Sequence, residues 1–184
     1  VYNGSNGGRY SLSMNEREAF NGDGQKGNNL LYIPTKEELA LMNFTQTVVK
    51  GKVIMDADQN RAAFEKWIES DSYAKNHRGQ YAERNSNMTG WEHQIDVHFG
   101  QKVYLKNICN FEFTFDIMNF ANCLNKKWGA QYSNVYNVSP LMVSKLTKGA
   151  DGNYTPVYQY NNPRLTKNDI LSRWHMQLGF RVSF

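Results

Sequence analysis

The chain has 184 residues, of which 40% are hydrophobic and 14% aromatic, and a formal net charge of +4. This length predicts one domain, and no apolar run reaches the roughly 18–20 residues that a membrane-spanning helix needs. The basic residues are scattered, with no run longer than Lys126-Lys127. A nucleic-acid interface would cluster them, so we expect no nucleic-acid partner.

The N-terminal part predicts turns. Residues 1–12 have the pattern of a strand end that breaks into a Gly/Asn-rich turn, and NGDGQKG at 21–27 predicts a second turn. Asn21, Asp23 and Gln25 keep the alternate spacing of oxygen donors around a hard cation. A calcium site at Asn21 and Asp23 and a plain turn both remain open, and the single carboxylate favours the turn.

Two short helices and a hairpin are predicted next. Thr35 followed by Glu38 has the spacing of a capping box and predicts a helix over residues 35–44. Residues 47–55 predict a small hairpin around Lys50-Gly51.

A second helix is predicted over residues 58–70, where Ala63, Phe64, Trp67 and Ile68 share one helical face. This face is interpreted as the core of a folded loop, with a contact surface for a surface lipoprotein lid as the alternative.

From about residue 91 the pattern changes to alternating strands. We predict strands over 91–105, 108–119, 131–146, 154–160 and 172–184. The connections at 106–107 and 147–153 are short, and those at 120–130 and 161–171 are longer. Cys109 and Cys123 fall in or beside one strand, about 46 Å apart if extended. Because a disulfide needs α-carbons within about 7 Å, we expect free thiols.

The alternation in these strands is long, aromatic on one side and charged on the other. Strands of roughly 9–11 residues cross a bilayer, whereas soluble strands average nearer 5–6. We therefore predict an all-β fold, a segment of an antiparallel transmembrane β-barrel with a partly helical extracellular loop at 13–90. The residues predicted to face the lumen are Asp96, His98, Glu112, Asp116, Arg173, His175, Gln177 and Arg181. Those predicted to face lipid are Trp91, Phe99, Phe113, Trp174, Phe180 and Phe184.

Five stretches carry a resemblance to a known family. They are YNGSNGGRYS (2–11), NGDGQKGNNLLYIP (21–34), RAAFEKWIESDSYAKNHRGQYAERN (61–85), DIMNFANCLNKKWG (116–129) and the final strand. Together they resemble the C-terminal part of a TonB-dependent receptor, of the branch with a carboxypeptidase-regulatory-like domain and a plug. The terminal Leu178, Phe180, Val182 and Phe184 also resemble the assembly signal of outer-membrane proteins. One departure from the family pattern is Asn29, which stands where that pattern has Asp.

The resemblance implies nutrient uptake across the outer membrane through a plugged barrel of about 22 strands. Five to six strands cannot close such a barrel, so we expect a fragment or a chain that pairs with other polypeptide. The implied partners are the rest of the barrel and its plug, the TonB complex through the missing N-terminal part, outer-membrane lipid and a lipoprotein lid. The C-terminus would be periplasmic and residues 13–90 extracellular.

Other functions stay open or are set aside. The sequence contains no HExxH or GxSxG motif, and we expect no enzyme and no cofactor. Lys126-Lys127-Trp128 could stack a sugar, or Trp128 could be an interfacial anchor. The alternatives to an active transporter are a soluble β-rich carbohydrate-binding module and a passive porin-like barrel.

Overall fold

The computed structural model describes residues 1–16, 27–106, 108–132, 137–163 and 165–184. The fold is mostly β, with 49% strand and 19% helix. The chain forms two compact units. Unit 1 comprises residues 1–8, 89–134 and 166–184, and unit 2 comprises residues 9–88 and 135–165. No helix of the described residues is long and apolar enough to cross a membrane.

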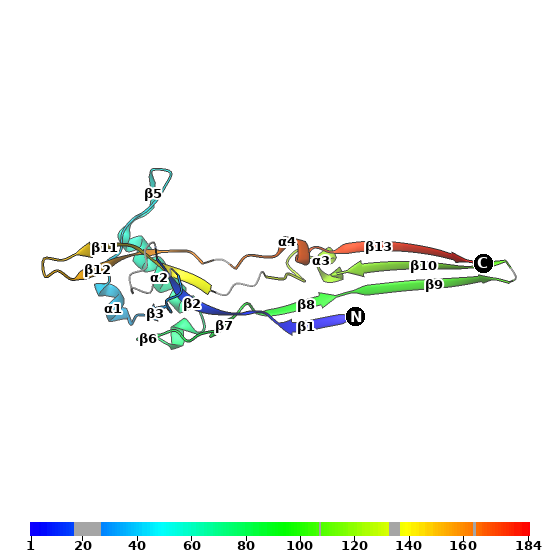
Figure 1. Ribbon diagram of the computed structural model, residues 1–184, viewed down its shortest axis with the longest axis horizontal. Helices are drawn as coiled ribbons and strands as arrows, with labels where there is room; N and C mark the ends of the chain where they lie inside the picture. The colour runs from blue at the N-terminus through cyan, green and yellow to red at the C-terminus, as the bar shows by residue number, and fades with distance from the viewer. Residues whose placement is uncertain (17–26, 107, 133–136, 164) are drawn as a thin grey trace. The chain divides into compact units, whose positions relative to one another are not determined.

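Figure 1 labels the elements of both units. Unit 1 contains β1 (Tyr2–Asn6), β8 (Trp91–Ile95), β9 (Val97–Leu105), β10 (Cys109–Met118), α3 (Phe120–Leu124), α4 (Asp169–Ser172) and β13 (His175–Ser183). Unit 2 contains β2 (Arg9–Glu16), β3 (Tyr32–Ile33), α1 (Lys36–Leu41), β4 (Thr47–Val49), β5 (Lys52–Met55), α2 (Ala57–Ser70), the 3-10 turn η1 (Ala74–Asn76), β6 (Gln80–Tyr81), β7 (Asn87–Met88), β11 (Asn137–Lys148) and β12 (Tyr154–Tyr160).

The main sheet of unit 1 has the order β13-β10-β9, and both pairings are antiparallel. The three strands lie side by side in Figure 1. β9 ends at Leu105 and β10 begins at Cys109, and Ile108 N–H donates to Leu105 O at 3.1 Å. We predicted a two-residue turn at 106–107. Leu105 pairs with Cys109, so Ile108 also lies outside both strands, and residue 107 of this prediction is outside the described residues. The register that follows decides which side chains meet across the sheet.

The predicted strand 91–105 is two strands, because the chain breaks at Asp96. β8 pairs with β1 and β9 pairs with β10. The predicted strand end at residues 1–12 also divides, into β1 and β2, at Gly7-Gly8. Gly7 N–H donates to Gly90 O at 2.7 Å, and a Cβ on Gly7 would lie 2.0 Å from Thr89 Oγ1. Only glycine allows the two segments to approach this closely.

Unit 2 is built on a mixed sheet with the order β12-β11-β2-β7. β11 pairs in parallel with β2 and antiparallel with β12. The pairing with β2 shifts register between Val138 and Leu141, where Pro140 lies. Proline cannot donate to a sheet and is tolerated at such bulges. The hydroxyls of Ser13 and Ser139 meet at 2.7 Å across this parallel pair.

The core of unit 2 is a single apolar cluster. Leu12 of β2, Ile33 of β3, and Phe64 and Ile68 of α2 are fully buried in it. The predicted face of α2 is confirmed, with Trp67 packed at the edge of the cluster. The predicted capping box at Thr35 and Glu38 is also confirmed, and a second one, not anticipated, joins Asp56 and Gln59 at the start of α2.

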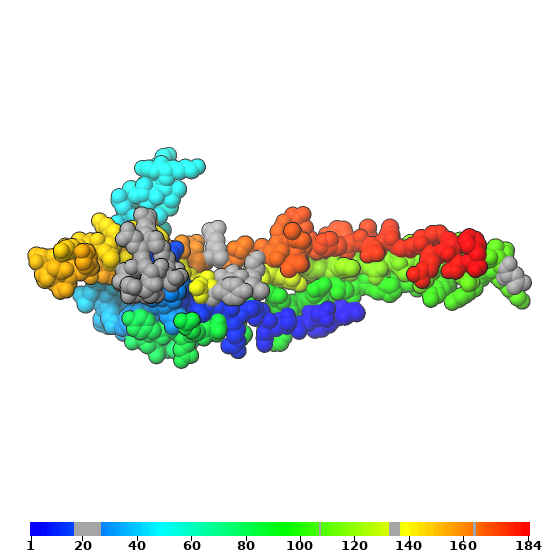
Figure 2. Space-filling view, viewed as in Figure 1, coloured from blue at the N-terminus to red at the C-terminus, as the bar shows by residue number. Residues whose placement is uncertain are grey.

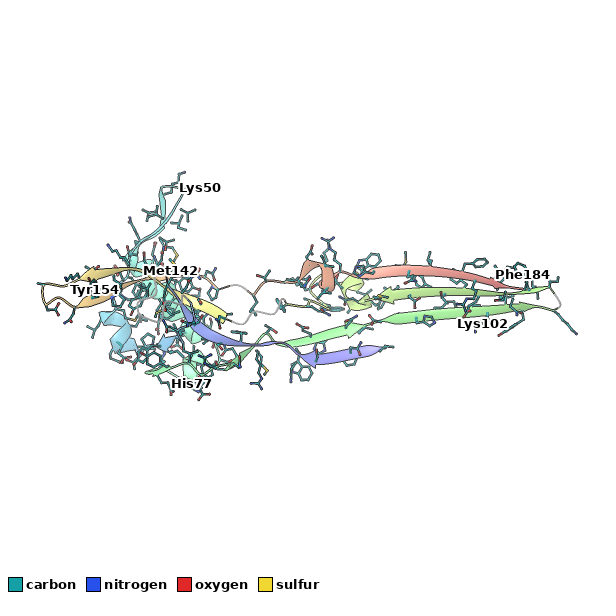
Figure 3. The ribbon with its side chains drawn as sticks, viewed as in Figure 1. Lys50, His77, Lys102, Met142, Tyr154 and Phe184 are labelled. Atoms are coloured by element: carbon teal, nitrogen blue, oxygen red, sulfur yellow. The ribbon has the colours of Figure 1, made fainter. Side chains whose placement is uncertain are left out.

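The predicted hairpin at 47–55 is confirmed as β4 and β5, whose tip at Lys50 stands away from the rest of unit 2 in Figure 3. Lys50 and Gly51 both have positive φ, at 50° and 77°, the backbone conformation of the tight turns that suit a twisted hairpin.

The domain boundaries differ from those we predicted. Residues 135–165 belong to the same unit as residues 9–88, not with the C-terminal strands. The strands expected at 131–146 and 154–160 form as β11 and β12, but they pair with β2 and not with the sheet of β9, β10 and β13. Val138, Leu141 and Val143 are buried in unit 2. The short connection predicted at 147–153 therefore joins two strands of unit 2, and its first two residues, Thr147 and Lys148, belong to β11.

Candidate functional site

The sheet formed by β9, β10 and β13 has one apolar and one polar face, and we name it the two-faced sheet. Its apolar face is the unusual surface of unit 1. Paired residues of an antiparallel sheet point to the same side. One side therefore carries the apolar residues Val97, Phe99, Val103, Leu105, Phe111, Phe113, Phe115, Ile117, Met176, Leu178, Phe180 and Val182. The rings of Phe111 and Phe180 lie 5.8 Å apart, centroid to centroid.

This apolar face is exposed to its surroundings. Phe99 is 54% exposed, Leu178 60% and Phe180 67%. Gln101 is the one polar residue that the register places among them. Isolated exposed apolar residues are common, but a continuous patch marks a surface that meets another apolar phase. Figure 2 shows β13, in red, along one edge of this sheet.

The opposite face of the same sheet is polar and paired by charge. Glu112 on the central strand lies 3.5 Å from the Lys102 ammonium on β9 and 3.9 Å from the Arg181 guanidinium on β13. Asp116 bonds His98 Nδ1 at 2.5 Å. Met118 and the aromatic Tyr104 are the exceptions on this side. The ion pairs are partly exposed, and each stabilises the sheet by roughly 0–1 kcal/mol. Their main effect is therefore to keep this face polar and hydrated.

A shallow hollow of about 280 Å³ lies over the polar face between Glu112, Thr114 and Gly179. A Cβ on Gly179 would lie 2.3 Å from Thr114 Oγ1. Any other residue at position 179 would fill the space that the Thr114 side chain occupies. A side chain at position 179 would therefore require the Thr114 side chain to turn away from its present position.

The structure brings most residues predicted to face the lumen onto the polar face. His98, Glu112, Asp116, Gln177 and Arg181 lie there by register, and His175 pairs with Met118 at its end. Arg173 does not, because it precedes β13 as the C-cap of α4 and pairs with Asp169. Asp96 lies between β8 and β9, and its carboxylate accepts from Asn119 N–H at 2.8 Å. It is a structural group that fixes the end of β10.

The residues predicted to face lipid divide in the same way. Phe99, Phe113 and Phe180 lie on the apolar face with the proposed assembly-signal residues Leu178 and Val182. Trp174 and Phe184 flank β13 and are outside it, although both are exposed. Trp91 is on β8, 65% exposed, and its indole stacks on the His93 ring at 6.2 Å.

Two hollows lie at the end of the sheet where β10 ends and β13 begins. The first, of about 360 Å³, is lined by Trp91, Trp128, Tyr132 and Lys127, among others. The second, of about 520 Å³, is lined by Lys126, Lys167, Asp169, Arg173 and Trp174, among others. Aromatic and cationic side chains therefore gather beyond the apolar strands.

Sequence reasoning missed two of the partners. Lys102, labelled in Figure 3, is the cation that Glu112 meets on β9; the register that pairs Leu105 with Cys109 places it opposite Glu112. Tyr2 donates to, or accepts from, His93 Nδ1 at 2.8 Å, a contact between residues too far apart in the chain for any local pattern to indicate.

The remaining site predictions concern metals and thiols. Asn21 and Asp23 lie outside the described residues. Within the described ranges, no three His, Cys, Asp or Glu side chains gather as a metal site would require. Cys109 and Cys123 are both free thiols, as predicted.

We compared the chain with models of known protein families, with curated proteins and with solved structures, and none matches.

Proposed function

We propose that unit 1 is part of the wall of an outer-membrane β-barrel, in a transporter of the TonB-dependent class that imports a nutrient. The observation that carries the proposal is the two-faced sheet, with aromatic and aliphatic residues exposed on one side and ion pairs on the other. A barrel wall has lipid on its outside and water on its inside, so its strands alternate in this way.

Strand length supports the same proposal. β9, β10 and β13 have 9, 10 and 9 residues, and about 9–11 residues of tilted strand cross a bilayer. In lipid the outer edges of β9 and β13 must be paired, because backbone N–H and C=O groups find no water there. The proposal therefore includes further strands of the same barrel as partners.

The connections of the sheet support an asymmetric barrel. β9 ends at Leu105 and β10 begins at Cys109, so their connection is short. At the opposite end, β1 ends, β8 begins, β10 ends and β13 begins. All long insertions thus leave unit 1 from one end. Outer-membrane barrels have short periplasmic turns and long extracellular loops, so unit 2 would be a folded extracellular domain and Phe184 would be periplasmic.

The choice of the TonB-dependent class rests on the resemblance of the stretches at 2–11, 21–34, 61–85 and 116–129. In that class the plug and the contact with TonB come from parts that these residues do not contain. Energised uptake would therefore belong to the assembled transporter, and a lipoprotein lid over unit 2 would be a further partner.

A soluble carbohydrate-binding module is the second candidate. It is favoured by the hollow between Trp91 and Trp128, whose exposed rings could stack on a sugar. In a soluble module, nothing would shield the apolar face of the two-faced sheet from water. For this reason we place the carbohydrate-binding function second.

Membrane extraction tests the proposal. The polypeptide that carries these residues is followed through fractionation of the source bacterium, and the outer-membrane fraction is washed with alkaline carbonate. We expect it to stay in the membrane pellet until detergent is added, and a deletion strain to lose uptake of one nutrient that also requires TonB. Release by carbonate without detergent would contradict the membrane proposal and favour the carbohydrate-binding module.

A further inference from the structure

The larger hollow at the end of the two-faced sheet has a cationic lining. Lys126 follows α3, Lys167 precedes α4, and Arg173 and Trp174 lie between α4 and β13. The hollow has a volume of about 520 Å³, and a small polar headgroup fits into a space of this size.

The positive charge of this hollow is only partly compensated. Among the described residues of its lining, Asp169 is the one carboxylate, and it pairs with Arg173. The Lys167 ammonium donates to Lys126 O at 3.0 Å, a neutral acceptor. Among the described residues neither Lys126 nor Lys167 has a carboxylate within ion-pair distance. Three cations and one carboxylate leave a net charge of about +2, which attracts an anion with more than one negative oxygen.

The position of the hollow indicates an amphiphilic anion. It adjoins the end of β10 and the start of β13, two of the three strands that carry the exposed apolar face. Trp174, 44% exposed, lines the hollow at this end. Tryptophan and lysine at the end of an apolar strand are typical of the level of lipid headgroups, where the ring has an apolar body and a polar edge.

We propose that Lys126, Lys167 and Arg173 bind the phosphate of a phosphorylated lipid, whose acyl chains lie along the apolar face of the two-faced sheet. The inference rests on the proposed membrane function and goes beyond it, because it assigns a specific headgroup site at the end of the two-faced sheet. Asn122, in the same lining, contributes no free donor, since its amide nitrogen already donates to Lys126 O and Trp128 O at 3.2 and 2.9 Å.

Calorimetry with a short-chain phosphatidic acid that stays monomeric in water tests this site directly. The protein is held in a zwitterionic detergent and titrated with dihexanoyl phosphatidic acid, with dihexanoyl phosphatidylcholine and with inorganic phosphate. The test variant carries Lys126→Gln, Lys167→Gln and Arg173→Gln. The matched control carries Lys52→Gln, Lys66→Gln and Lys145→Gln, three exposed lysines of unit 2, and loses the same charge.

We expect phosphatidic acid to bind the native protein and the control equally, and the test variant about 100-fold more weakly. Phosphatidylcholine should bind at least tenfold more weakly than phosphatidic acid, because its choline nitrogen offsets the phosphate charge. Equal binding of phosphatidic acid by the test variant and the control would overturn the site. Equal affinity for inorganic phosphate and phosphatidic acid would overturn the lipid as its ligand.

Failure of the site and failure of the membrane function give different results. Flotation with vesicles of pure phosphatidylcholine reports insertion alone and needs no headgroup site. Flotation of both variants, together with phosphatidic acid binding that ignores the substitutions, would reject the site and keep the membrane proposal. If neither variant floats and the protein is monomeric without detergent, the membrane proposal fails and the lipid site fails with it.

Discussion

The two units use the same apolar residue types in opposite ways. In unit 2, Leu12, Ile33 and Phe64 have no exposed surface. In unit 1, Phe99, Leu178 and Phe180 are more than half exposed. Burial of such a side chain stabilises a protein by roughly 1.5–3 kcal/mol. Unit 2 obtains this stabilisation from its own fold, whereas the two-faced sheet obtains it only where its apolar face meets an apolar surrounding.

The distribution of buried apolar residues makes the same point for the described part of the chain. The apolar core cluster lies wholly within unit 2. The buried apolar side chains of unit 1 are Cys109 and Ala121, both small. Among the described residues, the two-faced sheet therefore has no apolar core of its own, in contrast to unit 2.

The largest effect is expected in the core of unit 2. Phe64→Ala removes a fully buried ring that packs on Trp67 at 5.9 Å and Phe44 at 6.4 Å, centroid to centroid. We expect a loss of about 3–5 kcal/mol in the free energy of unfolding, from the lost burial and the cavity left behind. Guanidinium titration measures it. The loss should be the same with and without lipid, and a lipid-dependent loss would contradict a self-contained core.

A charge on the apolar face tests the other half of the comparison. Leu178→Arg should cost about 2–4 kcal/mol for the protein in lipid vesicles, because a cation near the bilayer centre is poorly solvated. Gln177→Arg is the matched control, since residue 177 points to the polar face beside Asp116. Unfolding in vesicles measures both. On a soluble sheet the exposed Leu178 would tolerate arginine within about 0.5 kcal/mol.

A buried amide holds three segments of unit 2 together. Asn60 is fully buried; its amide nitrogen donates to Thr45 O at 3.1 Å and Asp56 O at 2.9 Å, and its oxygen accepts from Tyr160 N–H at 3.1 Å. Asn60→Leu should cost about 1–3 kcal/mol, because it leaves backbone groups buried without partners. Thermal unfolding compares it with Asn43→Leu at an exposed site of the same unit, where a loss of similar size would show that hydrogen bonding at residue 60 is not the cause.

The smallest effect is the acid response of unit 2. Hydrogen bonds from the Thr35 backbone and from Tyr32 lower the pKa of Glu38, and the Arg78 hydrogen bond lowers the pKa of Glu69. A lowered folded-state pKa gives stability that is present above the ordinary value of 4.5 and lost as pH falls through the folded value. The melting temperature should therefore be flat above about pH 5 and fall below 4.5.

The double variant Glu38→Gln and Glu69→Gln checks this assignment. Glutamine keeps the capping contact of residue 38 but does not titrate, so the fall in melting temperature below pH 4.5 should become shallower. An unchanged slope would assign the acid response to other carboxylates.

Local patterns predicted the elements of this fold better than their partners. The capping box at Thr35, the face of α2 and the alternation of β10 each depend on residues within a few positions of each other, and all three are present. Alternation cannot say which strand lies alongside. β11 alternates like a wall strand, yet it pairs in parallel with β2, whose Ser13 meets Ser139 across 126 residues of chain.

The candidate site was predictable where register follows from a short turn. The faces of β9, β10 and β13 follow from parity once the pairing of Leu105 with Cys109 is known. The alternation of Arg173 and Trp174 continues that of β13, but the strand begins only at His175, because α4 and its cap occupy the preceding residues. The cationic hollow is lined by residues from two separate connections of the chain. No spacing in the sequence indicates that these residues lie together.

The most direct test is a cysteine scan along β13 in lipid vesicles. Single cysteines at positions 175–183, in a background of Cys109→Ala and Cys123→Ala, are labelled with an environment-sensitive fluorophore and exposed to a lipid-borne quencher. We predict that quenching alternates along β13 with a period of two residues. It should be strong at even positions such as 178 and 180 and weak at odd positions such as 177 and 181. Quenching without this period, or labels at the even positions that remain in water, would contradict a lipid-facing sheet.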